Sequence, residues 1–146
     1  MNVTQPLDQH LKILLAEDDR ELRELLAFSL FRVGYTVTSC SNGLELLERL
    51  DYRQSEDQER YDLVLTDLRM PALTGLEVLE ALHDLPDLPF VICMTAFGDS
   101  ATHEAAKALG ATETIDKPFD LDQLIALINS YFPATSGATS QQRSLS

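Results

Sequence analysis

The stretch LVLTDLRMPALTG, residues 63–75, decides the fold. It opens with an unbroken apolar run, and a single threonine then leads to Asp67. A turn that contains Pro71 and Gly75 follows. A continuous apolar run of this length is typical of a strand buried on both faces, as in a parallel sheet covered by helices. The stretch therefore predicts a rigid, buried strand with a carboxylate at its tip, open to a reaction partner.

Apolar strands and amphipathic helices alternate along the rest of the chain. The patterns predict strands at residues 12–16, 35–39, 62–66, 89–95 and 112–115. They predict helices at residues 19–32, 42–50, 75–85 and 100–109, and a last helix that Asp120 caps and Pro133 ends. One face of the first helix carries Leu22, Leu25, Leu26, Leu30 and Val33; the second carries Leu44, Leu47 and Leu50. This alternation predicts a doubly wound (βα)5 sandwich around a five-stranded parallel sheet.

The length of 146 residues predicts one domain, at residues 11–132. Residues 1–10 have no periodicity and are expected to be a flexible N-terminal segment. Residues 133–146 are small and polar, which is typical of a tail or linker. A polar stretch at residues 51–60 predicts an extended surface loop or an extra helical turn.

The composition excludes several function classes. The net charge is −13, which disfavours direct contact with nucleic acid and with anionic membranes. The sequence has no apolar run of transmembrane length and no export leader, so we expect a cytoplasmic location. Cys40 and Cys93 have neither metal-site nor disulfide-framework spacing and are expected to be reduced thiols in or near the core.

Polar side chains gather where the predicted strands end. Glu17, Asp18 and Asp19 follow the first strand, Asp67 the third, Thr95 and Ala96 the fourth, and Lys117 with Pro118 the fifth. Since the carboxyl ends of parallel strands share one edge of a sheet, we expect Asp18, Asp67, Thr95 and Lys117 to converge there.

Such a group of side chains has a definite chemistry. Neighbouring carboxylates repel one another, and Mg²⁺ relieves the repulsion. A carboxylate can attack an activated phosphoryl group to form an acyl phosphate. Lys117 would cancel part of the transferred charge, and Thr95 could donate a hydrogen bond to the new phosphoryl oxygens. Asp19, at the start of the first helix, is better explained as its cap.

The pieces LLAEDD, LTDLRMPALTG, MTA and DKPF occur in the order and spacing of a known family. Over residues 11–132 the sequence resembles the receiver domain of two-component response regulators. The resemblance implies a flavodoxin-like fold with strand order 2-1-3-4-5. It also implies that Asp67 is the phosphoacceptor and that Asp18 binds Mg²⁺ directly, with Glu17 acting through water.

The same resemblance assigns further roles. The backbone carbonyl of Arg69 would be a metal ligand, Thr95 the switch hydroxyl and Lys117 the partner of the phosphoryl group. The Lys117–Pro118 bond would be cis. One position departs from the family, because an aromatic residue is usual where this chain has Thr114. The switch is then expected to depend on Thr95 and backbone shifts, with Thr114 unable to fill an aromatic ring's volume.

The resemblance implies a phosphorylation-operated signalling switch and not an enzyme with an external substrate. A partner histidine kinase would phosphorylate Asp67, and self-phosphorylation from small donors and self-dephosphorylation remain open. The surface of the fourth helix, fifth strand and fifth helix would then control a C-terminal output domain, a partner or a homodimer.

Two alternatives use a similar sheet. An aspartate-nucleophile phosphohydrolase typically has a second aspartate two residues after the nucleophile, where this chain has Arg69. A flavin-binding module would need a phosphate-cradling loop after the first strand, where this chain is acidic. His10, His83 and His103 show no ligand spacing and are expected to be surface or hydrogen-bonded histidines.

Overall fold

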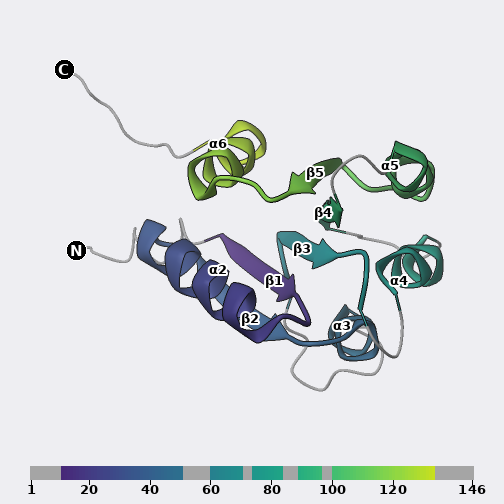
Figure 1. The fold of residues 1–146 in the computed structure, drawn as a ribbon. Helices are drawn as coiled ribbons and strands as arrows, with labels where there is room; N and C mark the ends of the chain where they lie inside the picture. The colour runs from purple at the N-terminus through teal and green to yellow at the C-terminus, as the bar shows by residue number, and fades with distance from the viewer. Residues whose placement is uncertain (1–10, 51–59, 71–73, 84–88, 97–99, 134–146) are drawn as a thin grey trace. The chain divides into compact units, whose positions relative to one another are not determined.

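A computed structural model describes residues 11–50, 60–70, 74–83, 89–96 and 100–133. These residues form five strands and five helices in strict alternation (Figure 1). The elements are β1 (Lys12–Ala16), α2 (Arg20–Val33), β2 (Thr36–Cys40), α3 (Gly43–Leu50), β3 (Leu63–Asp67), α4 (Gly75–Leu82), β4 (Phe90–Ala96), α5 (Ser100–Ala108), β5 (Glu113–Lys117) and α6 (Leu121–Tyr131).

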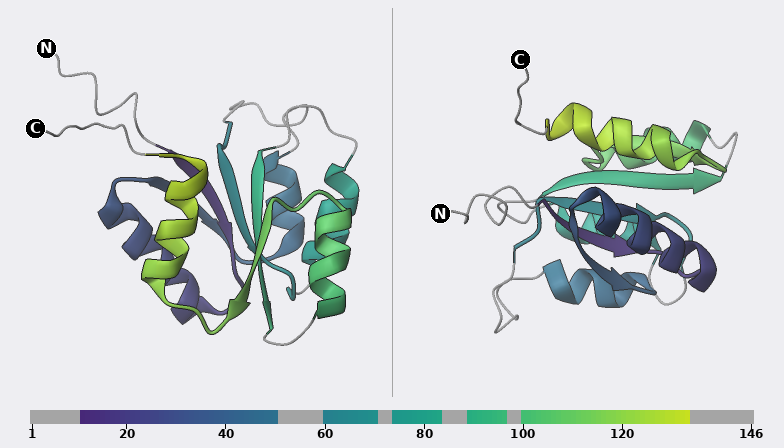
Figure 2. Two further views of the ribbon diagram at one scale, coloured as in Figure 1. Left: turned by 90° about the horizontal axis from the view of Figure 1, so that it is seen from above. Right: turned by 90° about the vertical axis from the view of Figure 1, so that its left-hand side faces the viewer.

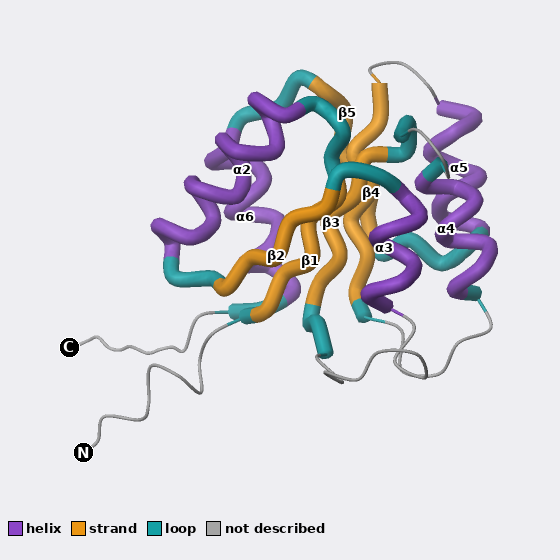
Figure 3. The backbone as a smooth tube through the Cα atoms, turned by 90° about the horizontal axis from the view of Figure 1, so that it is seen from below, coloured by secondary structure: helices purple, strands orange, loops and turns teal. Residues whose placement is uncertain are grey.

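The five strands form one parallel sheet in the order β2-β1-β3-β4-β5 (Figure 3). This order and the five parallel strands confirm the predicted doubly wound, flavodoxin-like fold. The register brings the carboxyl ends of the strands together: Asp67 at the end of β3 pairs with Met94, and Lys117 at the end of β5 pairs with Ala96 of β4. Polar residues distant in sequence therefore meet at one edge.

Helices cover both faces of the sheet. Helix α2 lies on one face, and α3, α4 and α5 lie on the other (Figure 2). All five residues of β3 are buried, as a strand between two helical layers requires. The core on the α3–α5 side is formed by apolar side chains of β1, β3, β4 and these helices, among them Leu14, Val64, Val91, Leu46, Val78 and Ala106.

Some predicted helix faces are wrong in detail. Leu26 and Leu30 of α2 are buried as expected, but Leu25 and Val33 are 51% and 45% exposed. In α3 the buried leucines are Leu46 and Leu50, whereas Leu44 is 50% exposed. Helix α2 carries apolar residues around more than half of its circumference, and in α3 Leu44 lies at the edge of the apolar arc, so the periodicity alone does not select the buried residues.

Local signals set the helix ends. The side chain of Asp19 caps α2 by accepting hydrogen bonds from the backbone N–H groups of Glu21 and Leu22. Gly34 ends that helix with a φ of 114°, which only glycine adopts readily. Thr74 and Glu77 form a capping box at the start of α4.

Several predicted boundaries differ from the structure. Strand β3 includes Asp67 as its last residue, and β5 extends to Lys117 rather than ending at Ile115. Helix α4 ends at Leu82, short of the predicted residue 85. The predicted loop at 51–60 falls, apart from Arg60, outside the described residues, as do the predicted terminal segments at 1–10 and 134–146.

The chain divides into two compact units. Residues Leu11–Pro118, which hold the whole sheet and α2 to α5, form one unit. The described part of the other unit is residues 119–133, with α6. The backbone N–H of Asp120 donates to Gln123 Oε1 at the start of α6, and Leu124 and Ile128 of its predicted apolar stripe are buried. None of the helices in the described ranges is long and apolar enough to cross a bilayer.

Candidate functional site

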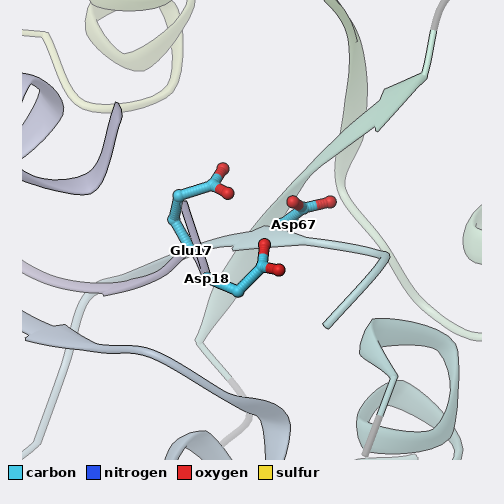
Figure 4. A group of neighbouring side chains, drawn as sticks. All are labelled: Glu17, Asp18 and Asp67. Atoms are coloured by element: carbon cyan, nitrogen blue, oxygen red, sulfur yellow. The ribbon is translucent and has the colours of Figure 1, made fainter. Parts of the chain in front are cut away.

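Three carboxylates meet at the carboxyl edge of the sheet. Glu17 and Asp18 follow β1 directly, and Asp67 ends β3. Each offers an oxygen that lies within 4.8 Å of the oxygens of the other two (Figure 4). Glu17 and Asp67 are buried, whereas Asp18 is exposed. The cluster is therefore anchored on two central strands and open to solvent on the side of Asp18.

Lys117 supplies the positive charge of this site. Its Nζ donates hydrogen bonds of 2.8 Å to Glu17 Oε1 and 2.8 Å to Asp67 Oδ2. The side chains of Glu17 and Asp67 are only 1% and 8% exposed, so water can replace few of the hydrogen bonds and little of the positive charge that Lys117 provides to them. The Lys117–Pro118 bond that follows is cis, as the resemblance implies. Of the four residues expected to converge, Asp18, Asp67 and Lys117 do so.

The electrostatics of the site follow from burial and pairing. Burial raises the pKa of Glu17 to about 7, and the nearby Asp67 carboxylate adds to the effect, although hydrogen bonds from Lys117 and the Asp19 N–H oppose it. Burial alone would lower the pKa of Lys117, but its bonds to Asp67 and Glu17 outweigh this, and the pKa is raised. The ammonium form of Lys117 is thus held beside an acid that is partly protonated near neutral pH.

Backbone contacts fix the acidic residues. The N–H of Arg69 donates to Asp67 Oδ1 over 2.9 Å, and the N–H of Asp19 donates to Glu17 Oε2 over 3.1 Å. Arg23 of α2 donates from Nη1 to the carbonyl oxygen of Glu17 over 2.8 Å. The sequence analysis did not predict this role of Arg23. The available signal was its place in the helix between Leu22 and Leu26, two residues of the predicted apolar face.

The donor set fits a hard divalent cation. Carboxylate oxygens are the ligands that Mg²⁺ prefers, and it usually keeps several waters, for which the exposed side of Asp18 leaves access. A cation would also remove the repulsion between Glu17 and Asp67, which adds to burial, the main cause, in raising the pKa of Glu17. Glu17, Asp18 and Asp67 could therefore hold Mg²⁺ together, and a backbone carbonyl such as that of Arg69 could complete the set.

Asp67 is less open than the sequence suggested. It is 6% exposed, and its two carboxylate oxygens accept hydrogen bonds from Lys117 and from the N–H of Arg69. The expectation of an accessible carboxylate at the strand tip is wrong in degree, although the position of Asp67 in the cluster is as expected.

Thr95 lies in a separate hydrogen-bond network on β4, β5 and α5. The residue is 2% exposed, and its hydroxyl donates to Asp116 Oδ1 over 3.1 Å. Its oxygen also lies 2.8 Å from His103 Nε2. His103 in turn contacts Asp116 and the hydroxyl of Thr114. The sequence pattern did not reveal His103, because its partners lie on two strands outside its own helix.

The other singled-out residues have ordinary surroundings. Cys40 and Cys93 are buried, and burial raises the pKa of each thiol to about 12, so both are unreactive. This agrees with their predicted place in the core. His83 is exposed after α4, and His10 lies outside the described residues.

Comparison with known proteins gives a consistent result. The family model described as "Response regulator receiver domain" matches residues 13–129. The chain is 34% identical over 125 residues to sporulation initiation phosphotransferase F of Bacillus subtilis, covering 86% of this chain and 96% of that protein. It is 39% identical to a transcriptional regulatory protein CpxR homolog of Haemophilus influenzae, covering 80% of this chain and 48% of the relative.

Solved structures agree with the sequence relatives. Response regulator TrrA of Thermotoga maritima, solved in complex with Mg(2+)-BeF, is 29% identical with a TM-score of 0.68, covering 82% of this chain and 97% of that one. The Francisella response regulator 1452 receiver domain superposes with a TM-score of 0.75 at 24% identity, covering 84% and 97%, and supports the fold. The chain spans about half of the CpxR homolog, a regulator of transcription by name. The chain belongs to the response regulator receiver domain family, whose members are regulatory domains of two-component signalling.

Proposed function

We propose that this chain is a phosphorylation-operated switch in which Asp67 accepts a phosphoryl group from a phosphohistidine of a partner kinase. One observation carries the proposal: Asp67 shares its carboxyl edge with two acids within 4.8 Å and with the Lys117 ammonium at 2.8 Å. A nucleophile, a candidate cation site and a fixed positive charge are the parts that phosphoryl transfer to a carboxylate needs.

The residues that would hold Mg²⁺ are Asp18 and Asp67 directly, Glu17 through water and the backbone carbonyl of Arg69. When bound, the ion supplies positive charge to the phosphoryl oxygens and to the repelling carboxylates. Lys117 would add its own positive charge, since its Nζ already contacts Asp67 Oδ2. The N–H of Arg69 keeps Asp67 Oδ1 in place during the reaction.

The transfer is a displacement at phosphorus. An oxygen of the Asp67 carboxylate forms the new O–P bond while the P–N bond of the phosphohistidine breaks. The electron pair of that bond returns to the imidazole nitrogen, which takes a proton from solvent. No base is needed on this chain, because the carboxylate attacks in its ionised form.

Phosphorylation would then alter a surface of this domain. The phosphoryl group adds about two negative charges at pH 7 and three acceptor oxygens, which Thr95 and Lys117 can contact after a rearrangement. Helix α5 is rich in alanine, and Ala106 is its buried residue, so few large apolar contacts oppose its movement. The surface that changes would comprise α5 and β5, with Thr114 as a second switch position, and α6 would be a further element that responds.

The partners follow from this role. Relatives such as the CpxR homolog and the DNA-binding transcriptional regulator NtrC of Escherichia coli are longer than this chain, which covers 48% and 24% of them. The switched surface would act on a C-terminal output domain, on another protein or on a second copy of this chain. Direct contact of this domain with nucleic acid is disfavoured by the net charge of −13. A cytoplasmic location remains our expectation.

The proposal does not include turnover of an external substrate. Self-phosphorylation from small phosphodonors and slow loss of the phosphoryl group to water are compatible with an Asp67 carboxylate beside Lys117. A phosphohydrolase is disfavoured because residue 69, where such enzymes place their acid, is an arginine with an exposed side chain.

Intact mass after incubation with acetyl phosphate and Mg²⁺ tests the proposal. We expect wild type to gain one phosphoryl group, and expect no gain for Asp67→Asn or with a chelator in place of Mg²⁺. Asp62→Asn is the matched control, because Asp62 is an exposed aspartate just before the same strand and should leave the gain intact. Equal phosphorylation of Asp67→Asn, or none of wild type, would contradict the proposal.

A further inference from the structure

The network around His103 occupies the position of the expected switch. Thr95 on β4 and Asp116 on β5 are register partners, and Thr114 lies two residues earlier on the same strand. His103 of α5 lies across both strands, so that its ring reaches the three side chains at once. The helix, the two strands and the switch hydroxyl are thereby joined through one imidazole.

The proton positions in this network can be assigned from the chemistry of the partners. The ionised Asp116 carboxylate only accepts hydrogen bonds, and it lies 2.6 Å from His103 Nε2. We therefore assign a hydrogen to Nε2, and this single hydrogen is shared between Asp116 Oδ1 and Thr95 Oγ1, which lies 2.8 Å from the same nitrogen. In the neutral ring Nδ1 is then the acceptor, and the Thr114 hydroxyl donates to it.

The hydroxyl of Thr95 is thus committed on both sides. It has one hydrogen, which it donates to Asp116, and its oxygen accepts from His103. While that hydrogen is engaged with Asp116 it cannot be donated to a phosphoryl oxygen on Asp67. Thr95 is 2% exposed, so solvent cannot replace these partners, whereas the Asp116 side chain is 41% exposed and can be satisfied by water.

We propose that His103 is a positioning residue of the switch: with Thr114 and Asp116 it holds the Thr95 hydroxyl away from Asp67 until phosphorylation. Thr114 supports this arrangement, since its hydroxyl pairs with the ring Nδ1 whereas Asp116 sets the tautomer, and an aromatic side chain lacking a hydroxyl at that place would not form this pair. The departure from the family pattern at position 114 is therefore matched by a histidine on α5. This proposal rests on the proposed function, in which Thr95 contacts the phosphoryl group.

The direction of the effect follows from linkage. Contacts that exist in the unphosphorylated state and must break on phosphorylation lower the affinity for a phosphoryl group or its analogue. Removing the His103 ring should raise the affinity for beryllofluoride with Mg²⁺ about three- to tenfold, the equivalent of one lost hydrogen bond. Thr114→Val, which keeps the shape of the side chain and loses only its hydroxyl, should raise it about twofold.

The experiment titrates beryllofluoride in the presence of Mg²⁺ and follows the Thr95 amide by NMR. We expect His103→Leu to bind more tightly and to move the unliganded Thr95 signal towards its beryllofluoride-bound position. His103→Gln should restore most of the wild-type affinity, because its amide can donate to Asp116 and Thr95. Glu104→Gln, at the exposed neighbouring position of α5, is the control and should match wild type.

Other outcomes overturn the proposal. Unchanged affinity and an unmoved Thr95 signal in folded His103→Leu would show that the ring does not restrain Thr95. Weaker binding of beryllofluoride by this variant would show that His103 favours the phosphorylated arrangement instead. Long-range ¹⁵N–¹H spectra of wild type test the arrangement without any phosphoryl analogue, and an unprotonated Nε2 in the neutral ring would refute it. If wild type bound no beryllofluoride, the proposed function would fail, while the spectra would still decide whether His103 holds Thr95.

Discussion

Lys117 Nζ donates a 2.8 Å hydrogen bond to Asp67 Oδ2, across fifty residues of sequence. The contact exists because β3 and β5 both flank β4 and end at the same edge of the sheet. It places a positive charge on the carboxylate that we propose as phosphoacceptor. The same ammonium contacts Glu17, so without metal one positively charged group serves two buried carboxyl groups.

Lys117→Met should destabilise the metal-free protein. It leaves Glu17 and Asp67 buried without their cation, and breaking a buried pair in this way costs about 3 kcal/mol. Mg²⁺ should recover much of this loss, because it can neutralise the same carboxylates. Urea unfolding at pH 8 with a chelator and with saturating Mg²⁺ measures both effects.

Lys107→Met is the control for this measurement. Lys107 is an exposed lysine of α5, and its loss should change the free energy of unfolding by less than about 0.5 kcal/mol with or without Mg²⁺. A Lys117→Met variant as stable as this control without metal would show that the lysine does not stabilise the two acids.

The adjacent residues Asp18 and Asp19 should separate metal binding from helix capping. Asp19 accepts hydrogen bonds from two N–H groups at the start of α2, so Asp19→Ala should lower the free energy of unfolding by about 1 kcal/mol without Mg²⁺. Asp18 is exposed and lies in the acidic cluster. Asp18→Ala should therefore leave the metal-free stability unchanged or slightly higher and abolish most of the stabilisation by Mg²⁺.

The two variants control for each other, since each removes one negative charge from the same loop. Mg²⁺ titrations followed by urea unfolding distinguish them. If Asp18→Ala retained the full Mg²⁺ effect and Asp19→Ala lost it, the proposed roles of the two aspartates would have to be exchanged.

The fold and the acidic cluster could be predicted from the sequence for a physical reason. Strands such as Leu63–Asp67 are buried on both faces, so their apolar runs stand out, and parallel strands bring their last residues to one edge. Asp18, Asp67 and Lys117 each follow or end such a run. Their convergence needed only the strand order and no knowledge of side-chain packing.

The parts that could not be predicted depend on helix rotation. Whether Leu25 or Leu26 is buried depends on how α2 turns against the sheet, and both fit a 3.6-residue period. The contact of His103 with Thr95 likewise requires α5 to present that side chain to β4 and β5. A histidine on an alanine-rich helix carries no spacing signal for partners on two other elements.

Arg23 should contribute to metal binding although it is no ligand. Its Nη1 holds the carbonyl of Glu17, which fixes the loop that bears both acidic residues. Arg23→Ala should weaken Mg²⁺ affinity about two- to tenfold, less than the full value of one hydrogen bond to a charged donor, because Arg23 acts on the ligands only through the loop. Isothermal titration with Mg²⁺ measures this.

Arg20→Ala is the matched control for Arg23. Arg20 begins the same helix, and its side chain is 80% exposed with an ion pair to Glu24. The two variants remove the same charge from the same helix, and Arg20 is closer to the acids along the chain. Loss of a positive charge alone should raise Mg²⁺ affinity slightly, as we expect for Arg20→Ala. A similar rise in Arg23→Ala would mean that Arg23 acts only through its charge and not by holding the Glu17 carbonyl.

Magnesium binding should release a proton near neutral pH. Burial raises the pKa of Glu17 to about 7, so about half of the metal-free molecules carry a proton on Glu17 at pH 7. Mg²⁺ favours the ionised form, and its binding should release roughly 0.5 proton at pH 7 and almost none at pH 8.5. The apparent affinity should fall about tenfold between pH 8 and pH 6.

The same titration has the opposite sign for folding of the metal-free protein. Because the pKa of Glu17 is higher in the folded state, its contribution to stability is full below about pH 4.5 and is lost as the pH rises through about 7.

Titration calorimetry in two buffers of different ionisation enthalpy counts the protons released when Mg²⁺ binds. Glu17→Gln should abolish the release at pH 7, whereas Asp19→Asn should preserve it. A wild-type protein that binds Mg²⁺ with no proton release at pH 7 would show that Glu17 is already ionised, and that Lys117 outweighs burial at this site.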